Sequence, residues 1–459
     1  MDLQRIETPG LAHYAYLLQD GDHALVVDPR RDVDIYLRRA RSMGARITHI
    51  LETHRQEDFV MGSTHLASLS GALVVNGQHD CFGRGDIRLG DGEALAFGSM
   101  RIKAVSTPGH TPESMCYAIY LGNSDSAWCV FTGDTLFFGE TGRTDLSDNA
   151  TAAENAGLLY DSVNEKLAGL GDHALIMPAH EPGSVCGSGI AERWVSTLGD
   201  EKQYNPVFTT DRNAFAQTRG SQRLPRPPYF RAMERINLKG GIPMPGSTDA
   251  ISTLNASEFS AQLSDTADTT VLDTREPEAY AGGHVEDTYS IWLDGLSSFG
   301  GWVAAENDRI ALITDRNDDI SQAVIYLNRI GFDNIVASLK NGFDEWRKSG
   351  LPISHCRTIT PTELNNELAA YQILDVREPG EFSSAHIEGA KSMYVGDLEQ
   401  HLDRLELDRN KPVAVTCSVG HRASLASSIL RRKGFQDVRN LIGGMSAWQA
   451  MDLATTREN

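Results

Sequence analysis

Two histidines and an aspartate lie where apolar, strand-like runs of the sequence end. His54 follows the run at residues 45–50, His110 closes a Thr-Pro-Gly-His segment after a second run, and Asp134 closes Thr-Gly-Asp after a third. His180 ends a fourth such run. Imidazole and carboxylate groups presented at the strand ends of an α/β scaffold are typical metal ligands. We therefore expect the four segments to converge on one rim and to offer metal ligands there.

These four segments resemble the metallo-β-lactamase fold, and the resemblance covers roughly the first half of the chain. The usual first motif of that fold is Thr-His-x-His-x-Asp-His. Here Gln56 and Phe59 stand where the motif has its second and third histidines, which removes one ligand from each half of the two-zinc site of the hydrolases. A two-metal hydrolase is therefore disfavoured. A decayed metal site is the alternative, and the intact segments 107–110 and 132–134 argue against it.

The candidate ligands that remain are His54, His110 and Asp134. A facial set of two histidines and one carboxylate leaves coordination positions open and suits ferrous iron that holds a substrate and dioxygen side by side. Within this fold, the set resembles that of the persulfide dioxygenases, which use a single iron. The resemblance implies one Fe(II) per chain, bound by these three residues. It places Asp58 and His180 behind the ligands or beside the substrate.

Two further side chains are candidates near the expected rim. Arg143 belongs to a Gly-Arg-Thr-Asp segment after Asp134 that recurs at this point in related persulfide dioxygenases. Its guanidinium either pairs with a substrate anion or forms an ion pair with Asp145 that shapes the loop. Cys186 lies in the Gly/Pro-rich loop after His180. It either relays sulfur near the iron or is a small buried thiol, and the buried thiol is favoured.

The second half of the chain contains an internal repeat. The stretch Leu-Asp-x-Arg-Glu-Pro occurs at residues 272–277 and again, 102 residues later, at 374–379. A period of that length indicates duplicated domains rather than a solenoid. Each copy alternates short strands and helices, which predicts a parallel sheet with covering helices. Both copies resemble rhodanese domains, and their Asp-x-Arg pairs are most simply ion pairs that maintain the fold.

The second copy carries a candidate nucleophile. Cys417 follows a strand-like run, and Arg422 precedes a helical stretch. The backbone N–H groups of such a loop, the helix N-terminus and Arg422 are expected to form an anion-binding nest that favours a thiolate. Four residues separate Cys417 from Arg422, whereas related phosphatases use five, so the ring size favours sulfur transfer. In the first copy, Asp315 stands at the cysteine position, and we expect a structural or docking role for that domain.

The predicted fold class is α/β: a metallo-β-lactamase αββα sandwich followed by two rhodanese-like α/β domains. We expect a persulfide dioxygenase domain at residues 1–240, an inactive rhodanese-like domain at 247–352 and a rhodanese domain with the active cysteine at 356–455. A stretch rich in proline and glycine, residues 221–246, ends the first domain and is interpreted as a surface linker.

The overall composition limits the classes of partner. The formal net charge of −20 repels phosphate groups, so neither nucleic acid nor an anionic membrane surface is expected to bind. The sequence contains no run of about 18 apolar residues, so we expect no membrane span. Because the start of the sequence is mixed polar, we expect no signal peptide. The six cysteines form no Cys-x-x-Cys pair. This favours free thiols and a cytoplasmic location.

The expected function is the iron-dependent oxidation of a small-molecule thiol persulfide by dioxygen to sulfite. Sulfur carried on Cys417 would then convert sulfite to thiosulfate, and the two steps together would detoxify sulfide. One rival is a zinc-dependent thioester or lactone hydrolase of the same fold. Another is a non-catalytic persulfide carrier in which only Cys417 is active. The sequence leaves open the carrier thiol, whether glutathione, coenzyme A or another, and the oligomeric state, a homo-oligomer included.

Overall fold

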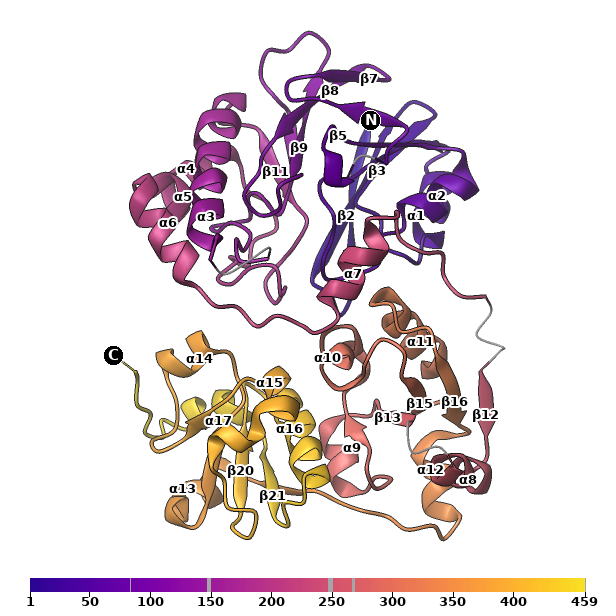
Figure 1. Cartoon of the computed structure of the whole chain (residues 1–459), viewed down its shortest axis with the longest axis vertical. Coiled ribbons are helices and arrows are strands. Elements are labelled where there is room, and N and C mark those ends of the chain that lie inside the picture. The colour runs from indigo at the N-terminus through magenta and orange to yellow at the C-terminus, as the bar shows by residue number, and fades with distance from the viewer. Residues whose placement is uncertain (83, 147–149, 247–250, 266–268, 459) are drawn as a thin grey trace. The chain divides into compact units, whose positions relative to one another are not determined.

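The computed structural model describes residues 1–82, 84–146, 150–246, 251–265 and 269–458 of the chain (Figure 1). The chain forms two compact units. The first comprises residues 1–226, 230–244 and 329–331, and the second comprises 227–229, 245–328 and 332–459. The predicted start of the second domain, residue 247, lies outside the described residues. Among the described residues, no helix combines the length and the apolar character that crossing a bilayer requires.

The first unit begins with a six-stranded mixed sheet, in which the strands follow one another in chain order. Its strands are β1 (Asp2–Thr8), β2 (His13–Asp20), β3 (His23–Val27), β4 (Arg46–Leu51), β5 (Leu73–Gly77) and β6 (Ile87–Leu89). Strands β1 to β3 are antiparallel, and β3 to β6 are parallel. Helices α1 (Asp34–Ser42) and α2 (Ser63–Ser70) cover its outer face, where Tyr36 and Leu66 pack on Leu17 and Ile50.

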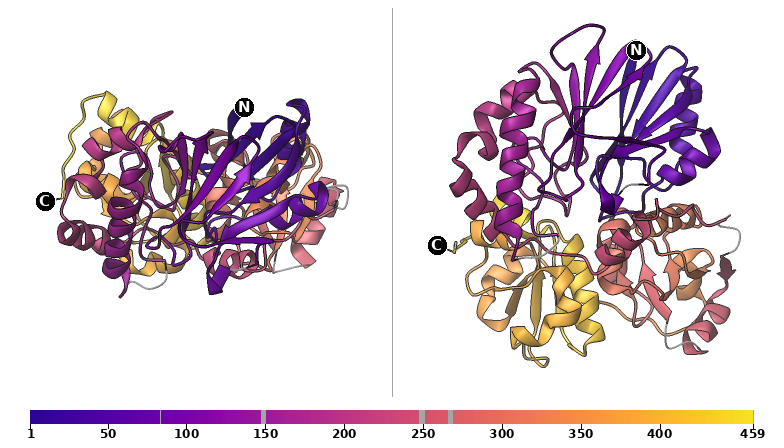
Figure 2. Two further views of the ribbon diagram at one scale, coloured as in Figure 1. Left: turned by 90° about the horizontal axis from the view of Figure 1, so that it is seen from above. Right: turned by 45° about the horizontal axis from the view of Figure 1, so that its top comes forward.

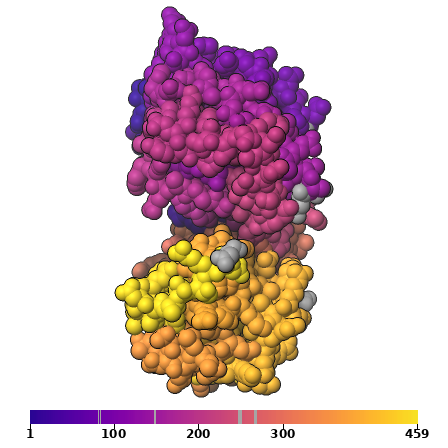
Figure 3. Space-filling view, turned by 90° about the vertical axis from the view of Figure 1, so that its left-hand side faces the viewer, coloured from indigo at the N-terminus to yellow at the C-terminus, as the bar shows by residue number. Residues whose placement is uncertain are grey.

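The second sheet of this unit has five strands in the order β11-β10-β9-β8-β7. They are β7 (Ala94–Phe97), β8 (Met100–Ser106), β9 (Met115–Leu121), β10 (Cys129–Gly133) and β11 (Leu175–Pro178). Helices α3 (Ala152–Asp161), α4 (Leu198–Tyr204), α5 (Pro206–Thr209) and α6 (Arg212–Ser221) cover its outer face. These helices are seen as ribbons in Figure 2, and this part of the chain forms the magenta surface in Figure 3. Helix α7 (Phe230–Asn237) follows.

The two sheets face each other across a buried core. Leu18 and Val27 of the first sheet pack with Ile102, Tyr117 and Phe131 of the second. Because the helices bury the opposite faces, the central strands are apolar on both sides, as the continuous runs of the sequence suggested. This arrangement confirms the predicted αββα sandwich (Figure 2).

The second unit contains two parallel five-stranded sheets with the same strand order, β12-β16-β15-β13-β14 and β17-β21-β20-β18-β19. The first has β12 (Ser252–Leu254), β13 (Thr269–Asp273), β14 (Tyr289–Ser290), β15 (Arg309–Ile313) and β16 (Ile335–Leu339). The second has β17 (Arg357–Ile359), β18 (Gln372–Asp375), β19 (Lys391–Ser392), β20 (Val413–Thr416) and β21 (Val438–Leu441). The shared order confirms the predicted duplication.

Helices flank both sheets of this unit (Figure 1). The first copy has α8 (Ala256–Asp265), α9 (Pro277–Gly282), α10 (Leu296–Val303), α11 (Asp319–Arg329) and α12 (Gly342–Lys348). The second has α13 (Pro361–Asn366), α14 (Pro379–Ser384), α15 (Val395–His401), α16 (His421–Arg432) and α17 (Gly444–Ala450). Each copy buries an Asp-x-Arg ion pair at a strand end. Arg275 binds Asp273 at 2.6 Å, and Arg377 binds Asp375 at 2.7 Å. Both arginines also donate to a backbone carbonyl of the following loop.

Candidate metal centre and sulfur-transfer loop

The structure brings His54, His110 and Asp134 together at the rim of the sandwich. They follow β4, β8 and β10, whose ends meet there. The Oδ2 atom of Asp134 lies 3.3 Å from Nε2 of His110 and 3.8 Å from Nε2 of His54. The two imidazole rings are nearly perpendicular, with centroids 5.0 Å apart. One potential ligand atom from each residue lies within 4.8 Å of the others, and all three residues are buried.

The three atoms that face one another have no hydrogen-bond partner within the described part of the chain. The opposite side of each residue is held in place. Nδ1 of His110 lies 2.8 Å from the carbonyl oxygen of Arg143, and Oδ1 of Asp134 lies 2.7 Å from Nδ1 of His180. Buried polar atoms without partners are costly, and three such atoms directed at one point fit a bound metal ion. The residues present therefore suit the metal that the fold implies.

His54 is oriented by a chain of hydrogen bonds that starts at Asp28. Asp28 follows β3 with a positive φ of 47° and accepts hydrogen bonds from the backbone N–H of Thr53 at 2.8 Å and from its hydroxyl at 2.6 Å. The Thr53 hydroxyl oxygen lies 2.9 Å from Nδ1 of His54 and accepts from it, which leaves Nε2 free for a metal. Burial lowers the pKa of His54 to about 3, so the ring is neutral as a ligand must be.

The structure places Asp58 and His180 directly behind Asp134. Nε2 of His180 lies 3.0 Å from Asp58, and Nδ1 lies 2.7 Å from Asp134. Burial lowers the pKa of His180, but the two carboxylates outweigh burial and raise it well above its usual value. An imidazolium that donates to two carboxylates offers no lone pair to a metal. Phe59, which stands at a histidine position of the motif, packs its ring 4.3 Å from that of His13.

Arg143 forms the ion pair with Asp145 that one of the two alternatives expected, and it shapes the loop in this structure. Its Nε and Nη2 atoms donate to the carboxylate of Asp145 at 2.6 and 2.8 Å. Its remaining N–H groups donate to the backbone carbonyls of Val185, Leu224 and Pro225. All five donors of the guanidinium are thus occupied. Cys186 is buried beside this loop, and burial raises the pKa of its thiol well above the usual value, as expected of the favoured buried thiol.

A pocket of about 490 Å³ opens beside His110. Its lining includes Glu57 and three arginines, Arg55, Arg226 and Arg231. Glu57 is completely buried and lies 3.8 Å from Nε2 of His110. Neither of its carboxylate oxygens has a hydrogen-bond partner among the described residues. Sequence reasoning missed Glu57 because the motif defines only its neighbour Asp58, and no pattern in a loop indicates which side chains face inward.

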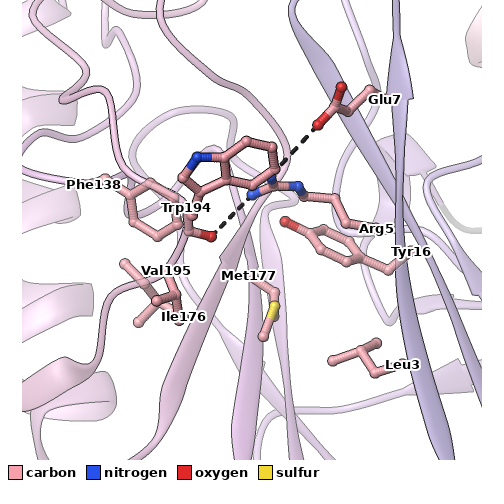
Figure 4. A pocket seen from close by; sticks show the side chains of 9 residues that line it. All are labelled: Leu3, Arg5, Glu7, Tyr16, Phe138, Ile176, Met177, Trp194 and Val195. Carbon is pink, nitrogen blue, oxygen red and sulfur yellow. Dashed lines mark hydrogen bonds and ion pairs between the residues drawn. The ribbon is translucent and has the colours of Figure 1, made fainter.

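A second cavity of about 340 Å³ lies at edge strands β1 and β11 (Figure 4). Its lining is mainly apolar and includes Met177 and the exposed Trp194. Arg5 crosses it and donates to the Trp194 carbonyl at 3.0 Å. Because its lining residues include no histidine or cysteine, we assign the chemistry of this unit to the His110 pocket.

Cys417 lies between β20 and α16, and its side chain is buried. The backbone N–H of Gly420, which has a positive φ of 116°, donates to its Sγ at 3.0 Å. The sequence also predicts Arg422 in this nest, and the structure shows which partners its side chain has. Its guanidinium donates to Glu381 at 2.7 and 2.8 Å and to the Ser418 hydroxyl at 2.6 Å. These bonds brace the side of the loop that contains Cys417.

Glu381 is a second residue that sequence reasoning missed. It lies in α14, two residues after the repeated Arg-Glu-Pro segment, and a comparison of the two copies could have found it. The first copy has Ala279 at the position of Glu381 and Ile320 at the position of Arg422, besides Asp315 at that of Cys417. The first copy thus lacks the acid, the arginine and the thiol together. This joint absence indicates that the three residues serve one function in the second copy.

Comparison with protein families agrees with this architecture. Residues 8–180 match the Metallo-beta-lactamase superfamily, and residues 255–349 and 360–451 each match the Rhodanese-like domain. The chain therefore consists of a metallo-beta-lactamase superfamily domain followed by two rhodanese-like domains.

Individual relatives give a more specific resemblance for the first domain. Persulfide dioxygenase ETHE1, mitochondrial, from Mus musculus is 28% identical over 252 residues, which are 53% of this chain and 91% of that protein. A probable hydroxyacylglutathione hydrolase of Schizosaccharomyces pombe is 31% identical over 175 residues, 37% of this chain and 64% of that protein. The crystal structure of a metallo-beta-lactamase from Staphylococcus aureus superposes with a TM-score of 0.65 at 29% identity, covering 74% of this chain and 99% of that one. The first domain is thus homologous to ETHE1, and rhodanese domains follow it.

Proposed function

We propose that the first domain oxidises the persulfide of a low-molecular-weight thiol to sulfite at one Fe(II) per chain. The observation that carries this proposal is the set of three partnerless atoms of His54, His110 and Asp134, within a domain homologous to a persulfide dioxygenase. Iron held by these residues would supply open coordination positions for the persulfide and for dioxygen. Dioxygen and water provide the oxygen atoms of sulfite, and the carrier thiol is released.

The residues of the chain bind and orient the reactants. Thr53, His180 and the carbonyl of Arg143 fix the directions of the three ligands. The pocket beside His110 has the volume of a small-molecule site. Arg55 pairs with Glu57 and Arg226 with Glu234 in this lining. A third arginine, Arg231, favours a carrier with a carboxylate or phosphate group.

We further propose that Cys417 transfers sulfur from a persulfide to sulfite. The Cys417 thiolate attacks the outer sulfur of the donor persulfide, whose S–S bond breaks and whose thiolate leaves. Sulfite attacks the outer sulfur of the cysteine persulfide, the S–S bond breaks, thiosulfate leaves and the Cys417 thiolate returns. The hydrogen bond from Gly420 to Sγ and the rhodanese match of residues 360–451 support this step. The described cysteines Cys116, Cys129, Cys186, Cys356 and Cys417 are free, which favours a reducing compartment such as the cytoplasm.

The test is oxygen uptake by protein reconstituted anaerobically with Fe(II), across persulfides of glutathione, coenzyme A and cysteine. We expect uptake in proportion to persulfide, with sulfite or thiosulfate as product and one iron per chain. Protein loaded with zinc is the comparison and should consume no oxygen. Two zinc ions per chain together with thioester or lactone hydrolysis would instead support the hydrolase.

A further inference from the structure

We propose that the rhodanese domain that lacks a cysteine positions the Cys417 loop of its neighbour. Its segment 287–292 and Glu276 hold helix α16, and through His421 they hold the loop that contains the nucleophile. This inference rests on the proposed role of Cys417 in sulfur transfer. It assigns a function to a domain that cannot itself carry sulfur, since residues 251–349 contain no cysteine.

Helix α16 is buried on more than one face. All residues from 423 to 430 are buried, whereas a helix that covers one face of a sheet leaves its other face in water. The corresponding helix of the first copy, α11, has Ser321 exposed near its start. One face of α16 packs on its own strands β20 and β21, and the other packs on β14 and α9 of the first copy (Figure 1).

Serine side chains join α16 to strand β14. The hydroxyls of Ser290 and Ser424 lie 2.7 Å apart, and both residues are buried. The backbone N–H of Ser290 donates to the hydroxyl of Ser428 at 3.1 Å. At the C-terminal end of the helix, the guanidinium of Arg432 stacks on the ring of Tyr289 at 4.3 Å. Buried hydroxyls require partners, so these bonds fix the position of the helix along the strand.

The N-terminal end of α16 is held at His421. Nε2 of His421 lies 3.2 Å from a carboxylate oxygen of Glu276, and its ring lies 4.7 Å from that of Trp292. Trp292 is supported in turn by Phe299, with ring centroids 5.3 Å apart. Glu276, Trp292 and Phe299 all belong to the first copy.

His421 is well placed to transmit this support. It follows Gly420, whose backbone N–H donates to Sγ of Cys417, and it precedes Arg422. A shift of His421 therefore moves both the donor to the sulfur and the arginine that braces the loop. Trp292 and Glu276 act as positioning residues, because their contact is with His421 and not with the reacting sulfur.

The experiment compares Trp292→Leu, Trp292→Phe and Glu276→Gln in the full chain, with Glu278→Gln as the matched control. Glu278 is an exposed acid in α9, the helix that begins directly after Glu276. Sulfur transfer from a persulfide donor to sulfite is measured as kcat and KM. We expect kcat to fall about tenfold in Trp292→Leu with little change in KM, because one aromatic contact is lost. Trp292→Phe should restore most of the rate, and Glu278→Gln should match the unchanged protein.

Hydrogen exchange provides a readout that needs no sulfur transfer. Backbone amides of residues 418–423 should exchange faster in Trp292→Leu and Glu276→Gln, while oxygen uptake and exchange in the first 200 or so residues stay unchanged. Unchanged kcat and unchanged exchange in both variants would overturn the inference. If the unmodified protein transferred no sulfur, the proposed role of Cys417 would be overturned. Hydrogen exchange at residues 418–423 would then decide by itself whether the first copy positions the loop.

Discussion

The guanidinium of Arg422 donates two hydrogen bonds, of 2.7 and 2.8 Å, to the carboxylate of Glu381. Burial raises the pKa of Glu381, but the hydrogen bonds and the charge of Arg422 outweigh burial and lower it to about 2. A carboxyl group whose pKa is depressed on folding stabilises the protein above its unfolded pKa of about 4.3. That contribution is lost as the pH falls through the folded pKa.

Glu381→Gln is therefore expected to lower the free energy of unfolding of the second unit at neutral pH. The difference from the unchanged protein should shrink as the pH falls from about 5 toward 3, because the native carboxylate loses its advantage there. Denaturant unfolding at several pH values measures it. Glu388→Gln, an exposed acid of the same domain, is the control. A difference that stays constant across this range would contradict the assignment.

Metal binding should depend on each of the three partnerless atoms. We expect His110→Ala and Asp134→Ala to lose bound iron and oxygen uptake together, since either change leaves two ligands. His23→Ala, which alters a partly exposed histidine away from the rim, should retain both. Metal analysis of the purified variants and an oxygen electrode provide the readouts. Full iron content in either ligand variant would rule out this ligand set.

His180→Gln tests the group behind Asp134. This change keeps all three ligands but removes the donor 2.7 Å from Oδ1 of Asp134. Loss of a hydrogen bond that orients a ligand typically weakens metal affinity about 10- to 100-fold. Competition with a chelator measures the affinity directly. Affinity equal to that of the unchanged protein would show that Asp134 is oriented without His180.

Cys417→Ser should leave oxygen uptake largely intact and change the product from thiosulfate toward sulfite. Serine keeps the shape of the loop but forms no persulfide. Cys356→Ser is the matched control, because Cys356 is another buried thiol of the same unit, whose pKa burial raises to about 11. If Cys417→Ser stopped oxygen uptake as fully as His110→Ala does, the two activities would not be separable. An unchanged thiosulfate yield would assign transfer to another thiol.

The sequence was sufficient to predict those candidate ligands that come shortly after the end of a strand. The positions of His54, His110 and Asp134 could be predicted to converge because strand ends of one sandwich meet at one rim, and the structure brings them together. The αββα sandwich was implied by the resemblance of these segments to the metallo-β-lactamase fold, and the duplicated α/β domains followed from the repeat of 102 residues.

Side-chain partners far apart in the chain could not be predicted in this way. Glu381 precedes Arg422 by 41 residues, and Asp58 precedes His180 by 122. Such pairs depend on how helices and loops pack, which no local pattern records. Arg143 shows the same limit. Its hydrogen bonds to Asp145 and to three backbone carbonyls depend on the loops that surround it, so the sequence alone left both alternatives for this residue open.

The equal strand order of the two rhodanese-like sheets also shows what the first copy would need in order to carry sulfur. The two copies share one scaffold, but the first has Asp315, Ile320 and Ala279 where the second has the thiol, the arginine and the acid. Asp315→Cys alone would introduce a sulfur atom without the pair of side chains that braces the loop of the second copy. Three substitutions are therefore needed together to rebuild the surroundings of Cys417 in the first copy.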